Sequence, residues 1–297
     1  MAKFSEETFN TWRYPPSNAE ETKLQNAEKL VRAAIAEDPK LSKLDLTIFG
    51  QGSYANDTNV RLNSDIDINI RYDGAFYYDI PEGKTRSDYG FNSPSQYSFA
   101  EFKIDLERAM VRKFGRTDVH NYDKCITVDA CDDRVEIDVV PTFKYRYYFK
   151  TGGFREGVQF LSNKGIAIRN YPLQHIENGK TKNSATQKRF KRLTRIFRKV
   201  RYKMIDDGHN VSDGITSFLL ECLVWNVPND IMNNNDTWTD RLTESIRHLY
   251  HATKTDEGCN NWVEVSKGLY LFINRKWSRQ DVNNYLLEMW TYLEFNG

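Results

Sequence analysis

The chain has 297 residues, of which 39% are hydrophobic and 13% aromatic, and this composition suits a soluble globular protein of one large or two modest domains. Its 42 Lys and Arg residues nearly balance its 41 Asp and Glu residues, which excludes a global field that would draw the whole molecule onto nucleic acid or an anionic membrane. No apolar run approaches the roughly 18 to 20 residues of a membrane span, and no signal or lipidation sequence is present, so we expect a cytoplasmic protein without a membrane partner.

The first half of the chain alternates between helical and strand patterns. In chain order we expect a helix at 17–37, strands at 44–50 and 64–73, a loop or lid at 74–97, a helix at 98–114, and strands at 125–130 and 134–143. Ser98 and Glu101 have the spacing of a capping box, which predicts the start of the second helix. The last two strands are separated by the short polar link CDD, which favours a hairpin. These elements predict a mixed sheet with helices packed against it.

From Thr186 onward the pattern is mostly helical. We expect helices at 187–205, 214–227, 239–251 and 281–295, with the Asn-rich stretch at 229–236 as an exposed connection. The simplest architecture is an α/β (α+β) fold with a mixed-sheet lobe over residues 1–150, which includes the N-terminal helix, and a helical lobe over residues 151–297. The cleft between two such lobes is where a binding site is expected.

Acidic residues alternate with isoleucines in the strand expected at 64–73. Asp65 and Asp67 share one face of that strand, so the isoleucines can be buried while the carboxylates are presented together. The strand expected at 134–143 presents Asp138 by the same alternation, and Asp138 joins the pair if the two strands are neighbours. Three carboxylates on adjacent strands can hold two Mg²⁺ ions about 3.5 to 4 Å apart, the arrangement that promotes in-line displacement at phosphorus. We therefore predict phosphoryl or nucleotidyl transfer, with these three residues as catalytic metal ligands and Mn²⁺ as the alternative ion.

A Gly-Ser turn precedes the aspartate pair. Gly52 allows the backbone to approach a phosphate closely, and the Ser53 hydroxyl and the amide N–H groups can donate hydrogen bonds to its oxygens. Together with Gln51 they form the predicted nucleotide-binding turn. A solvated surface is the usual explanation of each motif alone, but their combination and spacing favour a nucleotide site.

The motifs GSYANDTNVRLNSDIDI and EIDVVP, taken together, resemble the nucleotidyltransferase signature of the DNA polymerase β superfamily. More specifically, the chain resembles the cGAS/DncV-like nucleotidyltransferases, or CD-NTases, of bacterial antiphage CBASS systems. The similarity extends to NYPLQHIENGKTKN, the basic segment RFKRLTRIFRKVR, SFLLECLVWNVPND and the C-terminal region. The fold it implies is a polymerase β-like nucleotidyltransferase lobe followed by a helical lobe, with the site in the cleft between them.

The resemblance also implies an activity. Such an enzyme joins nucleoside triphosphates (ATP, UTP or GTP), releases pyrophosphate and closes a cyclic di- or trinucleotide second messenger. That messenger activates a separate effector in antiviral defence, and accessory CBASS proteins are candidate partners. In this chain Asp65, Asp67 and Asp138 match the metal ligands by motif position, and Asp138 is also placed to assist deprotonation of the attacking hydroxyl.

A basic segment lies in the expected helix at 187–205. Residues 178–205 contain no Asp or Glu but many Lys and Arg, and the resemblance implies that a cation here and a serine at the start of the next helix bind the triphosphate. We predict Arg195, with Lys191 as the alternative, and Ser217. A solvated helix face is the simpler alternative for any one cation. Binding of double-stranded nucleic acid is another, but one helix is little evidence for it, and we expect no nucleic-acid activator.

Base selection and product remain open at this point. Asn170 offers both a donor and an acceptor that could pair with a pyrimidine edge. In some members of the resembling family an Asn in this region is associated with uridine use, so the resemblance implies a uridine-containing product. Two alternatives to a cyclic nucleotide synthase are a non-cyclising nucleotidyltransferase acting on an RNA or protein acceptor and a catalytically silent nucleotide- or nucleic-acid-sensing module.

Overall fold

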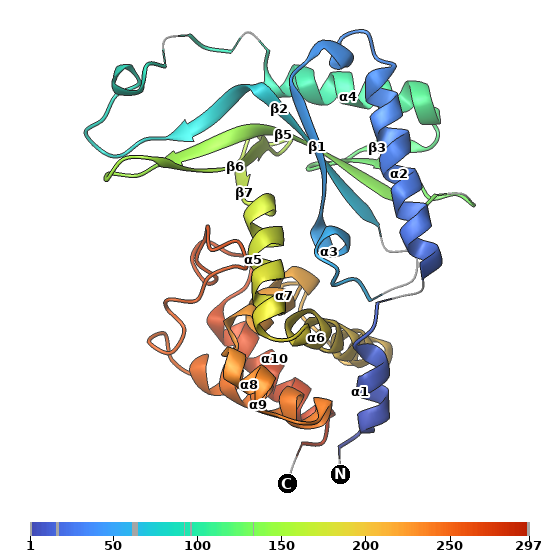
Figure 1. The fold of residues 1–297 in the computed structure, drawn as a ribbon, viewed down its shortest axis with the longest axis vertical. Coiled ribbons are helices and arrows are strands. Elements are labelled where there is room, and N and C mark those ends of the chain that lie inside the picture. The colour runs from blue at the N-terminus through green and yellow to red at the C-terminus, as the bar shows by residue number, and fades with distance from the viewer. Residues whose placement is uncertain are drawn as a thin grey trace. The chain divides into compact units, whose positions relative to one another are not determined.

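The computed structural model describes residues 2–15, 18–60, 65–91, 93–95, 97–132 and 134–295. The chain divides into two compact units, which are described separately (Figure 1). The sheet unit comprises Ser17–Tyr54 and Leu62–Pro172, and the helical unit comprises Met1–Pro16, Ala55–Arg61 and Leu173–Gly297.

A single mixed sheet organises the sheet unit. In the described residues its strands are β1 (Leu46–Gln51), β2 (Ile66–Asp79), β3 (Val119–Asn121), β4 (Ile126–Val128), β5 (Ile137–Tyr148), β6 (Phe154–Leu161) and β7 (Ala167–Asn170). The order along the main path is β1-β2-β5-β4-β3, and β6 pairs with both β5 and β7. The central pair β2/β5 is parallel, whereas the other pairs are antiparallel. The mixed sheet predicted from the sequence is therefore confirmed.

Helices α2 (Asn18–Ala36) and α4 (Phe99–Phe114) pack against each other and against one face of this sheet (Figure 1). Ile68, Ile70, Phe102 and Leu106 are fully buried in the core between them, as the alternation in β2 predicts. The predicted capping box is present, because the Ser98 hydroxyl accepts from the backbone of Glu101 and the Glu101 side chain accepts in return. Shorter helical segments in this unit are η1 (Leu41–Lys43), α3 (Gly52–Ala55) and η2 (Ser87–Tyr89).

Strand β2 is longer than the sequence indicates, and the sheet has further strands that were not predicted. The prediction of a loop from residue 74 is wrong over 74–79, because β2 continues to Asp79. The register of β2 against β5 shifts between Tyr72 and Phe76, so the period-2 pattern is broken at a bulge rather than at the end of the strand. The sheet also continues past residue 150 through β6 and β7, so its contacts extend beyond the predicted boundary between residues 150 and 151.

The helical unit contains α1 (Glu6–Trp12), α5 (Pro172–Ala185), α6 (Arg189–Asp206), α7 (Ser217–Asn226), α8 (Asn229–Asn233), α9 (Trp238–Ala252) and α10 (Arg279–Tyr292). Its core includes Phe190, Phe197, Leu220 and Leu286, all fully buried. The four predicted helices correspond to α6, α7, α9 and α10. The segment 229–236 is not simply an exposed connection, because it forms α8 and buries Met232 completely. Across the described chain, no helix combines the length and apolarity that a bilayer crossing requires.

Candidate active site

The parallel strands β2 and β5 bring two of the predicted carboxylates together. Asp67 and Asp138 are directly opposite each other in the β2/β5 register, with Ile66 opposite Ile137 beside them. Ile66 and Ile137 are buried, Asp67 and Asp138 are half-buried, and Asp65 is exposed just before β2. Strands β2 and β5 are therefore neighbours, as is required for Asp138 to lie beside Asp67.

The three carboxylates interact electrostatically. Burial of Asp67, together with the charges of Asp65 and Asp138, raises the pKa of Asp67 from 3.8 to about 7. The Thr127 hydroxyl on β4 donates to Asp138 Oδ1 at 2.5 Å. Strand β4 pairs with β5 on the side away from β2, so this hydrogen bond orients the Asp138 carboxylate from that side. Nothing in the sequence reasoning singled out Thr127, although it alternates with buried residues in a predicted strand. A cation placed here would relieve the repulsion that disfavours ionised Asp67.

The Gly-Ser turn lies against this carboxylate cluster. Gln51, the last residue of β1, is opposite Asp67 in the β1/β2 register, and Gly52 follows with a φ of 70°. A Cβ at Gly52 would overlap the Asp67 carboxylate. The glycine is therefore required twice, by its backbone conformation and by the close approach of a metal-ligand candidate. Ser53 follows within α3 and is half-buried.

A buried chain of hydrogen bonds orients Gln51, the residue before the Gly-Ser turn. Asn69 has no exposed surface, and its side-chain nitrogen donates to Gln51 Oε1 at 3.0 Å. The Thr142 hydroxyl on β5 donates to Asn69 Oδ1 at 2.7 Å. Both functions of the Asn69 amide are thus used, which fixes the orientation of Gln51 beside Asp67.

The donor set fits a divalent metal ion in its chemistry. Carboxylate oxygens are the ligands that Mg²⁺ prefers, and the raised pKa of Asp67 marks a place where negative charge is under-compensated. Within the described residues, no three His, Cys, Asp or Glu side chains are already converged on one point. A metal ion held by all three carboxylates would require these side chains to reorient, and Asp65 is the exposed one of the three.

The basic helix α6 buries several of its cations. Lys191, Arg195 and Arg198 are 9%, 4% and 6% exposed, so the alternative of a solvated helix face is wrong for these three. Arg195 donates to the backbone oxygens of Arg13 and Asp57 and forms an ion pair with the Asp57 carboxylate. Arg195 thus links Asp57 to α6 inside the helical unit.

Lys191 makes a weaker ion pair than Arg195 does. Its Nζ lies 3.9 Å from Asp57 Oδ2, a long contact, and burial lowers the pKa of Lys191 despite the attraction of Asp57. Ser217 begins α7, whose N-terminal end carries the positive end of the helix dipole and is capped by the Thr216 hydroxyl, and the Ser217 hydroxyl lies 3.2 Å from the Tyr202 hydroxyl. Both side chains belong to the helical unit.

A buried polar network in the helical unit joins α5, α6 and α7 to Thr58. Glu221 on α7 accepts from Thr58 at 3.0 Å and contacts His175 at 3.0 Å, while Arg198 donates to the Thr58 carbonyl at 2.6 Å. Burial raises the pKa of Glu221, but His175 and Arg198 outweigh it, and the net shift is downward. His175 is therefore a structural partner of Glu221 rather than a solvent-facing base.

Asn170 lies at the end of β7 and is exposed. The sequence-predicted residues thus fall into two groups. The sheet unit contains one group, which gathers around the end of β1 and the starts of β2 and β5: Gln51, Gly52, Ser53, Asp65, Asp67 and Asp138. Asn170 also belongs to the sheet unit. Lys191, Arg195 and Ser217 belong to the helical unit.

Comparison with known proteins gives a consistent result. Residues 177–294 match the family model of the cGAS/DncV-like nucleotidyltransferase C-terminal helical domain. Over 99% of its length the chain is 58% identical to the cyclic dipyrimidine nucleotide synthase CdnE of Cecembia lonarensis, all of which is covered.

Solved structures agree with this. The structure of the Elizabethkingia meningoseptica CdnE cyclic dinucleotide synthase with GTP and Apcpp has a TM-score of 0.81 at 35% identity, covering 98% of this chain and 99% of that one. The structure of the Rhodothermus marinus CdnE c-UMP-AMP synthase with Apcpp and Upnpp has a TM-score of 0.83 at 26% identity, covering 97% of both chains.

The mixed sheet with its paired aspartates and the helical unit together have the architecture of a nucleotidyltransferase. This chain belongs to the cGAS/DncV-like nucleotidyltransferase (CD-NTase) family, as the signature motifs predict.

Proposed function

We propose that this protein condenses nucleoside triphosphates into a cyclic dinucleotide second messenger. The observation that carries the proposal is the in-register pairing of Asp67 with Asp138 on adjacent parallel strands, beside a glycine turn whose geometry leaves room for the Asp67 carboxylate. The 58% identity to a cyclic dipyrimidine nucleotide synthase over nearly the whole chain supports cyclisation rather than addition to an RNA or protein acceptor.

Divalent metal ions, Mg²⁺ in the first place and Mn²⁺ as the alternative, would bind Asp65, Asp67 and Asp138. When bound, they would neutralise charge on the phosphates and polarise the attacking hydroxyl. Asp138 holds one carboxylate oxygen toward Thr127, and its other oxygen would accept the proton of the attacking hydroxyl. The pyrophosphate then leaves as the new phosphodiester bond forms, and a second round closes the ring.

Binding of the triphosphate is assigned to two sets of residues. Ser53 and the backbone of Gly52 would donate to its oxygens from the turn after β1. From the helical unit we assign this role to Lys191 and to Ser217 at the start of α7. Arg195, which the sequence favoured, is already paired with Asp57 and would act by holding Lys191 and the segment after the turn in place.

For the base, we propose a pyrimidine-containing product, with Asn170 as a candidate reader. The relative from Cecembia lonarensis supports uridine or cytidine use, while the Elizabethkingia meningoseptica enzyme was solved with GTP and Apcpp, so base choice varies within the family. We further propose that the messenger acts on a separate effector in antiphage defence, in the cytoplasm. Burial of three cations of α6 leaves less basic surface for a nucleic-acid activator.

The test is pyrophosphate release from each NTP and each NTP pair, with Mg²⁺, with Mn²⁺ and with EDTA. We expect metal-dependent release that is highest when a pyrimidine triphosphate is present, and loss of at least about 100-fold in the Asp65→Ala/Asp67→Ala double variant. The matched control is Asp45→Ala, because Asp45 is an exposed aspartate of the same unit. Unchanged release from the double variant would refute the assignment of the site.

A further inference from the structure

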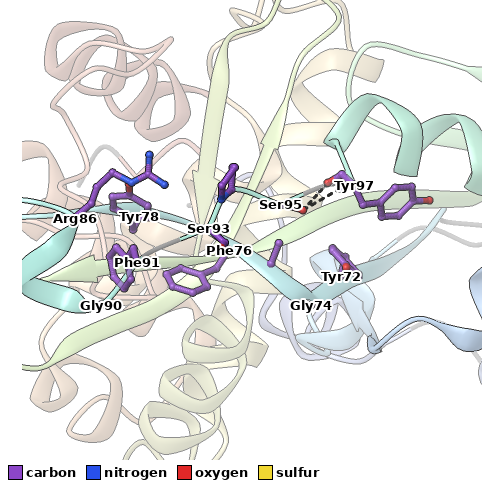
Figure 2. Close-up of a pocket in the computed structure, with 12 residues that line it drawn as sticks. Tyr72, Gly74, Phe76, Tyr78, Arg86, Gly90, Phe91, Ser93, Ser95 and Tyr97 are labelled. Atoms are coloured by element: carbon purple, nitrogen blue, oxygen red, sulfur yellow. Dashed lines mark hydrogen bonds between the residues drawn. The ribbon is translucent and has the colours of Figure 1, made fainter.

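A cavity lies in the sheet unit, around the bulge of β2 (Figure 2). Its volume is about 650 Å³, within the range of small-molecule sites. It is lined by Tyr72, Gly74, Ala75, Phe76, Tyr78, Arg86, Gly90, Phe91, Ser93, Pro94, Ser95 and Tyr97. None of these residues has a role in the proposed reaction.

The bulge in β2 creates the floor of this cavity. Tyr72 is opposite Phe143 on β5, and Phe76 is opposite the next residue, Lys144, so the residues between Tyr72 and Phe76 have no partner on β5. Gly74 has no side chain, and the Tyr72 phenol packs directly against its backbone, where a Cβ would overlap the Tyr72 hydroxyl. Ala75 adds only a methyl group to the lining. Bulges of this kind commonly re-aim side chains at functional sites.

Aromatic rings form both ends of the cavity. Figure 2 shows Phe76, Tyr78 and Phe91 gathered at one end and Tyr72 and Tyr97 at the other. Phe91 packs at 4.6 Å from Tyr78 and 5.2 Å from Phe76, measured between ring centroids, and Tyr72 packs at 5.5 Å from Tyr97. All five rings are only half-buried, with Arg146 over Phe76 and Lys40 over Tyr97, so each ring still has exposed surface for contact with a flat ligand.

Among its described residues, the lining of the cavity carries positive charge and no negative charge. Arg86 is its only charged lining residue, and it is exposed and forms no ion pair within the described part of the chain. The acidic residue nearest to it in sequence, Asp88, is occupied by Thr85, whose backbone N–H and hydroxyl donate to it at 2.7 and 3.1 Å. Figure 2 shows Arg86 beside Tyr78 and Phe91. A guanidinium in a cavity lined by aromatic rings, with no carboxylate among the described lining residues, suits a ligand that joins a flat ring to an anionic group.

We propose that this cavity is an accessory nucleotide site, in which the base lies against Phe91 and its aromatic neighbours and the phosphate pairs with Arg86. The site is separate from the catalytic carboxylates. Gly74 is seven residues beyond Asp67 on the same strand, a separation of roughly 20 Å at the usual rise of about 3.3 Å per residue. The proposal therefore goes beyond the proposed function and does not depend on it. The ligand has two sources, a free mononucleotide or the cyclic dinucleotide product.

The experiment is isothermal titration calorimetry of the full-length protein in EDTA with four probes: inorganic phosphate, uridine, UMP and cyclic di-UMP. Because ring and anion are recognised together, UMP or cyclic di-UMP should bind at least tenfold more tightly than phosphate or uridine. Tighter binding of UMP identifies a free nucleotide as the ligand, and tighter binding of cyclic di-UMP identifies the product.

Two pocket variants assign the binding to this cavity. Arg86→Ala should weaken nucleotide binding about tenfold through loss of charge-assisted contacts, and Phe91→Leu should weaken it to a similar degree because it keeps apolar volume but removes the ring face. Lys84→Ala is the matched control, since Lys84 is an exposed cation two residues from Arg86 and does not line the cavity. Asp67→Asn should bind as the wild type does, which separates this site from the catalytic one.

The proposal is overturned if no probe binds, or if nucleotide binding is unaffected in both pocket variants. It is also overturned if binding is lost in Asp67→Asn, because the nucleotide would then occupy the catalytic site. Circular dichroism of each variant distinguishes loss of binding from loss of folding.

Discussion

Replacement of Asp67 by Asn should stabilise the metal-free protein. Asp67 is half-buried and lies near two like charges, so its pKa is about 7 instead of 3.8, and the ionised form carries an unfavourable free energy in the folded state. This difference in pKa corresponds to about 4 kcal/mol when the carboxylate is charged. Since water reaches part of the side chain, we expect a gain of about 2 to 4 kcal/mol in the free energy of unfolding at pH 8 in EDTA.

The pH dependence follows from the same shift. Between about pH 4 and pH 7 the folded protein keeps the proton on Asp67, whereas the unfolded chain loses it, so the wild-type stability falls as pH rises through this window. Above about pH 8 both states are ionised and the penalty is constant. The Asn variant should lack this component of the pH profile.

The assay is thermal unfolding followed by far-UV circular dichroism from pH 5 to pH 8, in EDTA and with excess Mg²⁺. Mg²⁺ should raise the melting temperature of the wild type, because binding to the folded state is linked to stability, and should raise that of Asp67→Asn much less. Asp45→Asn is the control and should match the wild type. Lower stability of Asp67→Asn in EDTA at pH 8, together with an equal response to Mg²⁺, would refute the reasoning.

Three other substitutions test the structure around the site. Gly52→Ala should reduce pyrophosphate release at least about 100-fold, because its Cβ would overlap a catalytic carboxylate, whereas Gly83→Ala, also at positive φ but with no atom near the added Cβ, should keep full activity. Asn69→Ala should lower the free energy of unfolding by about 1 to 3 kcal/mol in urea titrations, because it leaves Gln51 and its other partner unsatisfied; a neutral result would contradict the buried chain of hydrogen bonds. Glu221→Gln should cost about 2 to 4 kcal/mol in the same titrations, since it removes a buried carboxylate charge that His175 and Arg198 stabilise, and a stability equal to wild type would contradict this role of Glu221.

Much of the site could be predicted from the sequence because it follows strand alternation. Asp65 and Asp67 alternate with isoleucines that are buried, and Asp138 alternates with buried residues in β5. The register that sets Asp67 opposite Asp138 is a long-range property of two strands some 70 residues apart. Alternation predicts which face a side chain occupies, but pairing depends on the packing of the whole sheet.

Other features depend on tertiary structure and left no local pattern. The bulge after Tyr72 breaks the period of β2, so residues beyond it looked like a loop although the strand continues. The cations of α6 have the spacing of an ordinary amphipathic helix, and the contact of Arg195 with Asp57, 138 residues away in the sequence, depends on tertiary packing. The short strands β3 and β7 have three and four residues, too few for any periodic signal.

The most direct test of the central claim is the identity of the product. The purified protein is incubated with all four NTPs and Mg²⁺, treated with phosphatase and analysed by mass spectrometry. We predict a phosphatase-resistant product with the mass of two nucleoside monophosphates less two waters, containing at least one pyrimidine, and absent from the Asp65→Ala/Asp67→Ala variant. The claim would be contradicted if all products were linear and phosphatase-sensitive. It would also be contradicted if the double variant made the same cyclic product.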